Sequence, residues 1–309
     1  MIQDRPFLGL LLMIGFCVLA PLGDSMAKLL GETIPIGQIL TVRFLAQVVF
    51  LLPVVLLTGL SLRMSKRVFR LTLVRTALHI IGIGAMFQSL RYLPLADAIA
   101  IAFVMPFIML LLGKFALGEE IGHRRILACI VGFVGTLLVV QPSFAAVGAP
   151  ALLPLLVAVV FALFMLVTRQ IAKETDPIGL QAVSGLMASV VLVPLLWISD
   201  GGAIAVLDPV MPSGKEWLLL ALLGFLGTCA HLLMTWSLRF APSATLAPVQ
   251  YLEIPMATII GWLIFRDFPN GLAAIGIAIT IAAGLYIIIR EGRLSREAQP
   301  APPAPTPSA

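Results

Sequence analysis

Ionisable and polar residues stand inside long apolar runs of this chain, where a charge is costly. Glu253 is the strongest example, because it lies within the apolar run 244–265 and Gln250 precedes it by three residues, on the same face of a helix. Tyr251 lies beside that face. An ionisable residue inside a membrane costs about 2.5–3.5 kcal/mol to insert and normally faces an interior cavity. Glu253 is therefore predicted to bind a cationic or hydrogen-bonding ligand or to exchange a proton, unless it forms a structural pair with an Arg or His.

A second polar stripe occupies the run 216–238. Thr228, His231, Thr235 and Arg239 follow one another at spacings of three and four residues, which places them on one helical face. Such a stripe in an apolar run indicates a cavity wall, and His231 is of the residue type that titrates near neutral pH. The alternative is a histidine bonded to a carbonyl of a neighbouring helix.

Three further charged or titratable residues lie in the second and third apolar runs. His79 shares a helical face with Arg75, which is nearer the end of its run and is expected to extend toward the lipid headgroups. Arg43 lies deep in the run 35–58 and either contributes to a site or fixes helix packing through an ion pair. Asp24 either pairs with Arg43 or lines the outer mouth. The predicted substrate-binding residues are Arg43, His79, His231, Thr235, Gln250, Tyr251 and Glu253.

The sequence contains no recognisable catalytic or nucleotide-hydrolysis motif. Glu120 and His123 have a spacing that can place two metal ligands on one face, but no second motif matches it. Cys17, Cys129 and Cys229 show no metal-type spacing. We therefore predict no enzyme activity, no cofactor and no metal site.

The composition sets the class of protein. The chain has 309 residues, 60% hydrophobic and 11% charged, with a mean hydropathy of +1.09. Soluble domains are roughly 45–50% apolar and about 25% charged, so a water-soluble protein is excluded. A membrane helix needs about 20 apolar residues. Suitable runs lie at 7–29, 35–58, 70–91, 94–116, 124–141, 150–169, 178–199, 216–238, 244–265 and 271–290. The sequence predicts an all-α integral membrane protein with ten transmembrane helices.

Positive residues at the ends of these runs indicate the orientation. If the N-terminus is in the cytoplasm, the cytoplasmic side receives most of the Lys and Arg residues, including those within 63–70. The opposite side receives only Lys28, Arg91, Lys215 and Arg266. This asymmetry predicts a multi-pass protein of the cell inner membrane with both termini in the cytoplasm. The net charge of +5 is explained by this distribution and not by nucleic-acid binding.

An internal repeat divides the chain into two halves. The segment 91–94 (Arg-Tyr-Leu-Pro) corresponds to 239–242 (Arg-Phe-Ala-Pro), and Pro106 corresponds to Pro255. Two five-helix repeats are thus predicted, and because five is odd, the second inserts upside down relative to the first. Inverted repeats are common in carriers that hold a solute near the midplane, so the repeat indicates a transporter.

The predicted domains follow from this repeat. The first five-helix repeat covers residues 7–141 and the second covers residues 150–290. Residues 291–309 are predicted to be a disordered cytoplasmic tail, because the last ten residues are rich in Pro and Ala and carry no charge.

Several short phrases resemble the EamA family of the drug/metabolite transporter superfamily. They are Asp-Ser-Met-Ala-Lys at 24–28, Val-Arg-Phe at 42–44, Pro-Leu-Ala-Asp-Ala at 94–98, Gly-Glu-Glu at 118–120, Gly-Phe-Val-Gly at 132–135 and Ala-Pro-Val-Gln-Tyr-Leu-Glu at 247–253. The last phrase is most similar to the S-adenosylmethionine carrier branch, and riboflavin carriers are a comparable match. The resemblance implies ten helices, cytoplasmic termini, a central cavity and no ATP hydrolysis.

The predicted function is a secondary carrier of a small polar metabolite, most simply the uptake of a vitamin or cofactor-type solute such as riboflavin or S-adenosylmethionine. An exporter of amino acids or other metabolites is the alternative. An intramembrane lipid-modifying enzyme is disfavoured, since its catalytic residues should cluster at one membrane face. A channel is harder to exclude. The expected partners are the metabolite and membrane lipids, with a homo-oligomer left open.

Overall fold

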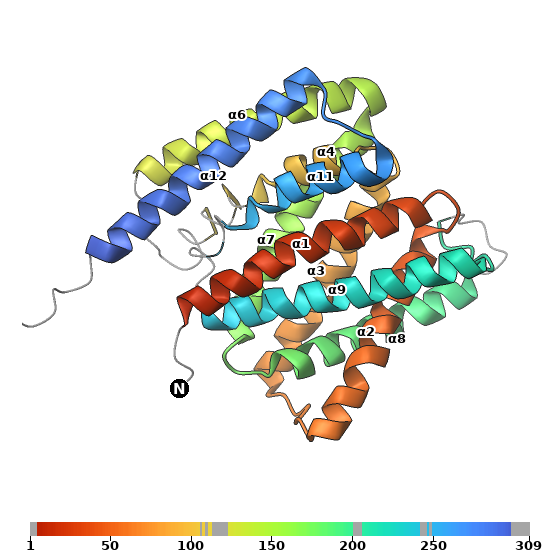
Figure 1. Cartoon of the computed structure of the whole chain (residues 1–309). Helices are drawn as coiled ribbons and strands as arrows, with labels where there is room; N and C mark the ends of the chain where they lie inside the picture. Colours follow the sequence, from red (N-terminus) through yellow and green to blue (C-terminus); the bar gives the residue numbers. More distant parts are fainter. Residues whose placement is uncertain are drawn as a thin grey trace, which may run out of the picture.

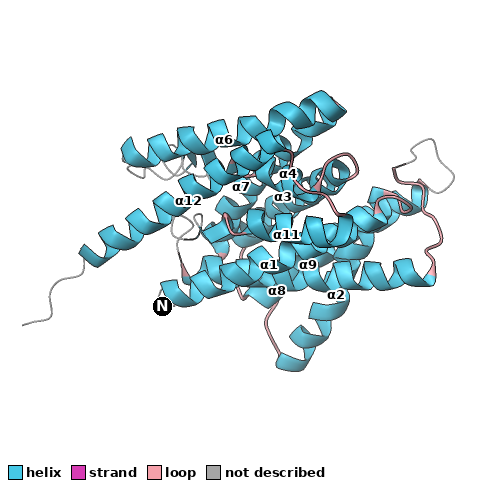
Figure 2. Ribbon diagram, turned by 45° about the horizontal axis from the view of Figure 1, so that its top comes forward, coloured by secondary structure: helices cyan, strands magenta, loops and turns pink. Residues whose placement is uncertain are grey.

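The computed structural model describes residues 5–105, 107–108, 111–112, 123–199, 206–241, 246 and 249–297. Within these residues the fold is helical and contains no strand (Figures 1 and 2). The helices are α1 (Pro6–Leu30), α2 (Ile36–Thr58), α3 (Lys66–Leu90), α4 (Leu95–Ala102), α6 (His123–Val147), α7 (Leu153–Ile171), α8 (Pro177–Ile198), α9 (Gly214–Phe240), α11 (Glu253–Phe265) and α12 (Gly271–Glu297). A short 3-10 helix, Ala149–Leu152, precedes α7.

Several helix ends follow from local sequence. The Asp176 side chain accepts backbone N–H groups at the start of α8, and Pro177 occupies the first helical position. Ser213 and Glu216 form a capping box at the start of α9. Gly59, with φ at 66°, ends α2 in the left-handed region that glycine adopts without strain. These caps fix where the second, eighth and ninth helices meet their loops.

Seven segments of the described chain are long and apolar enough to cross a membrane. They belong to α1, α2, α3, α6, α7, α8 and α9, whereas α11 and the apolar part of α12 are shorter. The protein is therefore a multi-pass, all-α membrane protein. The predicted count of ten spans is not reached among the described residues and stays a prediction.

Two predicted spans are interrupted. In the run 94–116, α4 ends at Ala102 and a turn follows at Phe103, while in the run 244–265 a turn at Tyr251 precedes α11. Phe103 and Tyr251 are as far apart in sequence as the repeat partners Pro94 and Pro242, so the breaks fall at equivalent positions. The rings of Phe103 and Tyr251 pack against each other, with centroids 5.2 Å apart. The two broken helices thus meet at their breaks.

The helix contacts repeat when the halves are exchanged. The most extensive packing joins α1 to α9, and its equivalent in the other half joins α7 to α3. Two other extensive contacts pair a helix with its own counterpart: α2 packs on α8, and α6 packs on α12 along one side of the bundle (Figure 1). This arrangement fits a two-repeat fold.

The last helix is longer than predicted. Residues from 291 onward were expected to form a disordered tail, but α12 continues to Glu297. The added segment contains Arg, Leu and Glu, which favour helix even where the chain has ceased to be apolar. The predicted boundary, set by hydropathy, therefore falls too early, and residues 298–309 lie outside the described part of the chain.

A close glycine contact joins α6 to α12. A Cβ atom added at Gly276 would lie 2.4 Å from the backbone oxygen of Gly135, so neither helix has room for a side chain there. We expect Gly276→Ala to lower the thermal unfolding midpoint, because overpacking typically costs about 1–3 kcal/mol. Gly271→Ala is the matched control, since nothing lies within 4 Å of its added Cβ. Equal midpoints for the two variants in detergent would contradict the α6–α12 packing.

Candidate functional site

A cavity lies between the two halves of the bundle. Its polar lining consists of Asp24 from α1, Arg43 from α2, His231 from α9, and Gln250 and Glu253 on either side of the second helix break. Its volume is about 80 Å³, which is smaller than the roughly 300–1,000 Å³ of typical small-molecule sites. A solute of vitamin size therefore requires the surrounding helices to separate.

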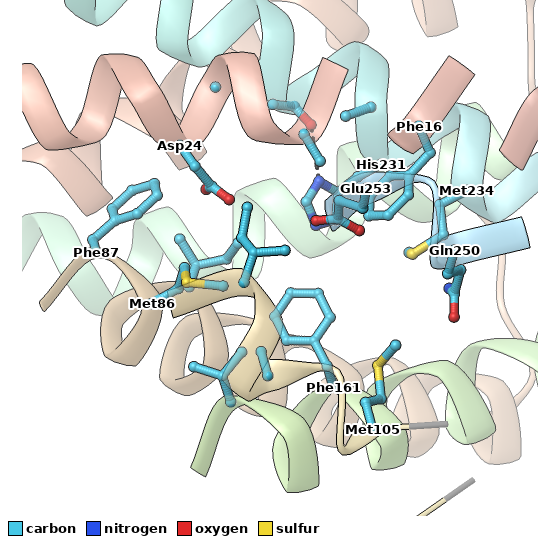
Figure 3. Close-up of a pocket in the computed structure, with 18 of the residues that line it drawn as sticks. Phe16, Asp24, Met86, Phe87, Met105, Phe161, His231, Met234, Gln250 and Glu253 are labelled. Atoms are coloured by element: carbon cyan, nitrogen blue, oxygen red, sulfur yellow. Dashed lines mark hydrogen bonds between the residues drawn. The ribbon is translucent and has the colours of Figure 1, made fainter. Parts of the chain in front are cut away.

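The rest of the cavity wall is apolar and rich in aromatic and methionine side chains. Phe16, Phe87, Phe103 and Phe161 contribute rings, and Met86, Met105, Met165 and Met234 contribute thioethers. In Figure 3 the carboxylates of Asp24 and Glu253 and the ring of Phe161 point into the same space. Aromatic faces suit flat ring systems, and flexible methionines adapt to irregular ligand shapes. The wall therefore combines stacking surfaces with a few charged groups.

The second helix break places Gln250 and Glu253 at the cavity. Glu253 was expected in the middle of a continuous helix, but it is the first residue of α11. The positive end of the helix dipole therefore lies at its carboxylate, which favours the negative charge. Gln250 is buried and its amide nitrogen lies 3.3 Å from the Met165 sulfur. A broken helix can thus present side chains and exposed backbone groups to a solute.

Arg43 connects α2 to α9 inside the bundle. Its Nη2 atom lies 3.0 Å from Nδ1 of His231 and donates to the Gly227 carbonyl at 3.3 Å. A guanidinium only donates, but Nδ1 of His231 also lies 3.0 Å from the Gly227 carbonyl oxygen, which only accepts, so these two contacts require different tautomers of the ring. A Cβ at Gly227 would lie 3.0 Å from Nε of Arg43, so the glycine leaves room for the guanidinium. Asp24 interacts electrostatically with Arg43 from α1.

Thr235 lies behind the cavity wall. Its hydroxyl donates to the His231 carbonyl at 2.7 Å and accepts from the Gln181 amide at 3.1 Å. Gln181 in turn accepts from Gln47 of α2, through both its backbone and its side-chain oxygen. These hydrogen bonds connect α8 and α2 to α9 within one helical turn of His231. The structure therefore places Thr235 among packing contacts and not among the lining residues.

His79 and Arg75 form a buried polar cluster next to the cavity. The His79 ring stacks on His231, with centroids 4.4 Å apart, but His79 does not line the cavity itself. Arg75 was expected to reach the lipid headgroups, yet it is fully buried. It donates to Thr168 at 2.9 Å and to Ser184 at 2.8 Å, because its helical face turns toward α7 and α8 and not toward lipid.

Of the predicted substrate-binding residues, the structure brings Arg43, His231, Gln250 and Glu253 to one cavity. His79 stands directly behind His231. Tyr251 is buried at the junction of the two helix breaks and, like Thr235, is not a lining residue. The predicted set therefore divides into a cavity wall and a supporting layer.

Sequence reasoning missed part of the wall. Asp24 was considered as a partner of Arg43 but was left out of the predicted set, although its place inside an apolar run was an available signal. Phe16 and Phe161 gave no signal, since aromatic residues are ordinary in apolar helices. In the described residues, no group of three or more His, Cys, Asp or Glu side chains is arranged to hold a metal ion.

Comparison with known proteins finds one family of transporters and several transporters of known substrate. The model of the EamA-like transporter family matches residues 7–141 and again residues 149–290. A riboflavin transporter of Rhizobium johnstonii is 31% identical over 229 residues, which are 74% of this chain and 72% of that protein. An S-adenosylmethionine uptake transporter of Rickettsia prowazekii is 26% identical over 277 residues, 89% of this chain and 90% of that protein.

Two further matches are an exporter and a solved structure. A pseudopaline exporter of Pseudomonas aeruginosa is 26% identical over 275 residues, 88% of this chain and 90% of that protein. A solved crystal structure with a TM-score of 0.66 and 18% identity covers 94% of this chain and 98% of its own, which shows a shared fold. The family match spans nearly all of the apolar sequence and the relatives are carriers, so this protein is a transporter and not an enzyme. The chain belongs to the EamA-like transporter family.

Proposed function

We propose that this chain is a secondary transporter that takes up a small polar vitamin or cofactor-type solute across the cytoplasmic membrane. In this proposal ten helices form two inverted five-helix repeats, at 7–141 and 150–290, with both termini in the cytoplasm. The cavity between the halves alternates between the two sides of the membrane. No nucleotide drives the cycle, so the solute moves by exchange or along a gradient.

The observation that carries this proposal is the meeting of two helix breaks at one polar cavity. Broken helices at equivalent positions of two repeats are the usual place for a solute in carriers of this construction. Here the break at Phe103 and the break at Tyr251 both border the cavity that Asp24, Arg43 and Glu253 line.

The character of the wall supports a particular class of solute. Aromatic rings from three helices and the first break favour a flat heterocycle, and the charged groups favour a solute with several hydrogen-bonding groups. Riboflavin and S-adenosylmethionine, which give two of the relatives their names, both combine a flat ring system with a polar chain. They are therefore the first two solutes to test.

Glu253→Gln is expected to reduce uptake of the transported solute at least tenfold. The substitution keeps the size of the side chain but replaces the ionisable carboxyl group, which lies at the start of α11 and lines the cavity, with a neutral amide. The measurement is accumulation of labelled riboflavin or S-adenosylmethionine by cells producing the chain. Glu32→Gln, the same change at an exposed turn residue, is the matched control. Equal uptake by the two variants would exclude a role for the Glu253 charge.

Export is a second candidate because one relative is a pseudopaline exporter. The two directions are separated by comparing right-side-out with inverted membrane vesicles under an imposed proton gradient. Uptake predicts accumulation in right-side-out vesicles. Accumulation only in inverted vesicles would assign the chain to export.

A further inference from the structure

The polar cluster behind the cavity contains more hydrogen-bond donors than partners. Nη2 of Arg75, both ring nitrogens of His79 and Nε2 of His231 are buried and have no hydrogen-bond partner among the described residues. Each of these three side chains is at most 5% exposed. Leaving a buried donor unpaired costs about 1–3 kcal/mol, and more for a charged group. Four buried nitrogen atoms without a partner among the described residues, all in one region, indicate a place built for a ligand.

The unpaired atoms belong to one contiguous group. The His79 and His231 rings stack at 4.4 Å, while Arg75 and His79 both pack on the Phe164 ring, at 4.5 Å and 4.7 Å. In the tautomer of His231 whose Nδ1 accepts from Arg43, Nε2 carries the proton and donates. Arg75 contributes a second donor, and a neutral His79 ring contributes a third.

The charge of the cluster is positive and is not balanced locally. Arg75 binds only the hydroxyls of Thr168 and Ser184, and no carboxylate of a described residue lies within ion-pair distance of it. By contrast, Arg43 interacts with Asp24. An arginine inside a membrane protein normally has a counter-charge, because an unpaired ion there is costly. A donor-rich, positive cluster of this kind is suited to an acidic group.

We propose that Arg75, His79 and His231 form a subsite for a carboxylate of the transported solute. Of these residues His231 lines the cavity, whereas Arg75 and His79 lie behind its wall. The Phe161 ring also lines the cavity, and its centroid lies 6.4 Å from that of the His79 ring. The cavity itself is lined by Asp24 and Glu253, whose carboxyl groups suit a cationic group. The solute is then a zwitterion that also carries a flat ring system. This inference rests on the proposed transport function and narrows its substrate class.

Phe161 controls access to the subsite in this proposal. Its ring packs directly on the backbone of α3, where a Cβ added at Gly82 would lie 2.8 Å from two ring atoms. Gly82 therefore provides the space that Phe161 occupies while the subsite is closed. When the helices separate around a solute, a rotation of Phe161 joins the subsite to the cavity.

Binding of a small carboxylate tests the subsite without requiring transport. We expect 50 mM acetate to raise the thermal unfolding midpoint of the purified protein by several degrees, and its neutral analogue acetamide to have no effect. Arg75→Gln abolishes the acetate shift, whereas Arg63→Gln, the same change at an exposed loop residue, retains it. An equal acetate shift in the two variants, or no acetate shift in the unmodified chain, overturns the subsite.

His79→Phe provides a second variant in case Arg75→Gln does not fold. Phenylalanine keeps an aromatic ring among Phe44, Phe161 and Phe164 but removes both unpaired nitrogens. We expect this variant to fold and to show a reduced acetate shift. A shift as large as that of the unmodified chain contradicts the assignment of His79.

Transport separates this inference from the proposed function. We expect Arg75→Gln to raise the half-saturating concentration of S-adenosylmethionine, which has a carboxylate, at least tenfold. A chain that moves only riboflavin, which has none, overturns the subsite and leaves the transport proposal intact. A chain that shows the acetate shift but moves neither solute overturns the proposed function and, with it, the assignment of the carboxylate to a solute.

Discussion

Arg43→Met is expected to abolish transport and to destabilise the protein by about 1–3 kcal/mol, the usual cost of leaving a buried hydrogen-bonding group without its partner. The guanidinium is fully buried, bonds to His231 and Gly227, and interacts electrostatically with Asp24. Removing it leaves the Asp24 carboxylate inside the bundle without its cation, and α2 without its polar contacts to α9.

The reason for this effect can be tested with a second substitution. Asp24→Asn in the Arg43→Met background removes the unpaired negative charge, so we expect it to restore most of the lost thermal stability but not the transport. Unfolding midpoints and solute uptake are measured for the two single variants and the double variant. A double variant less stable than Arg43→Met would show that Asp24 and Arg43 do not act as a pair.

Ala20→Phe is expected to reduce transport at least tenfold while leaving the fold intact. Ala20 lines the cavity from α1 and is partly exposed, so a phenyl ring at this position projects into space that a solute must enter. The cavity must widen to admit a solute, and the added ring occupies part of the space that this widening provides. The expected defect is therefore in uptake and not in the amount of folded protein.

Ala145→Phe is the matched control for this experiment. Ala145 lies on an exposed face of α6, away from the lining residues, so the same change there adds volume only to the outer surface. Uptake of the transported solute is normalised to folded protein, quantified by size-exclusion chromatography in detergent. Normal uptake by Ala20→Phe would show that the solute passes elsewhere.

Most of the fold could be predicted from hydropathy alone. The runs 7–29 and 35–58 agree within two residues with α1 (Pro6–Leu30) and α2 (Ile36–Thr58). The helix breaks at Phe103 and Tyr251 could not be predicted in this way, because hydropathy measures how apolar a segment is and not whether its backbone stays helical. The extension of α12 was missed for the opposite reason, since a polar segment can continue a helix.

The sequence predicts those site residues whose charged or titratable side chains are energetically costly to place inside a membrane. Arg43, His231 and Glu253 stand out in apolar sequence because a charged or titratable side chain there needs a special environment. Thr235 was predicted because it is polar and shares a helical face with His231. Its hydroxyl instead donates to a backbone carbonyl of its own helix, as threonines in helices often do. Phe161 could be found only from the structure, since its role comes from where its ring lies.

Transport by the purified chain in liposomes tests the central claim most directly. Labelled riboflavin and labelled S-adenosylmethionine are supplied separately outside liposomes that contain only the purified protein, with no nucleotide present. The account predicts saturable entry of at least one of these solutes, and loss of that entry in Ala20→Phe but not in Ala145→Phe. Entry of both solutes at the rate of protein-free liposomes would contradict the assignment of this chain as a carrier of cofactor-type metabolites.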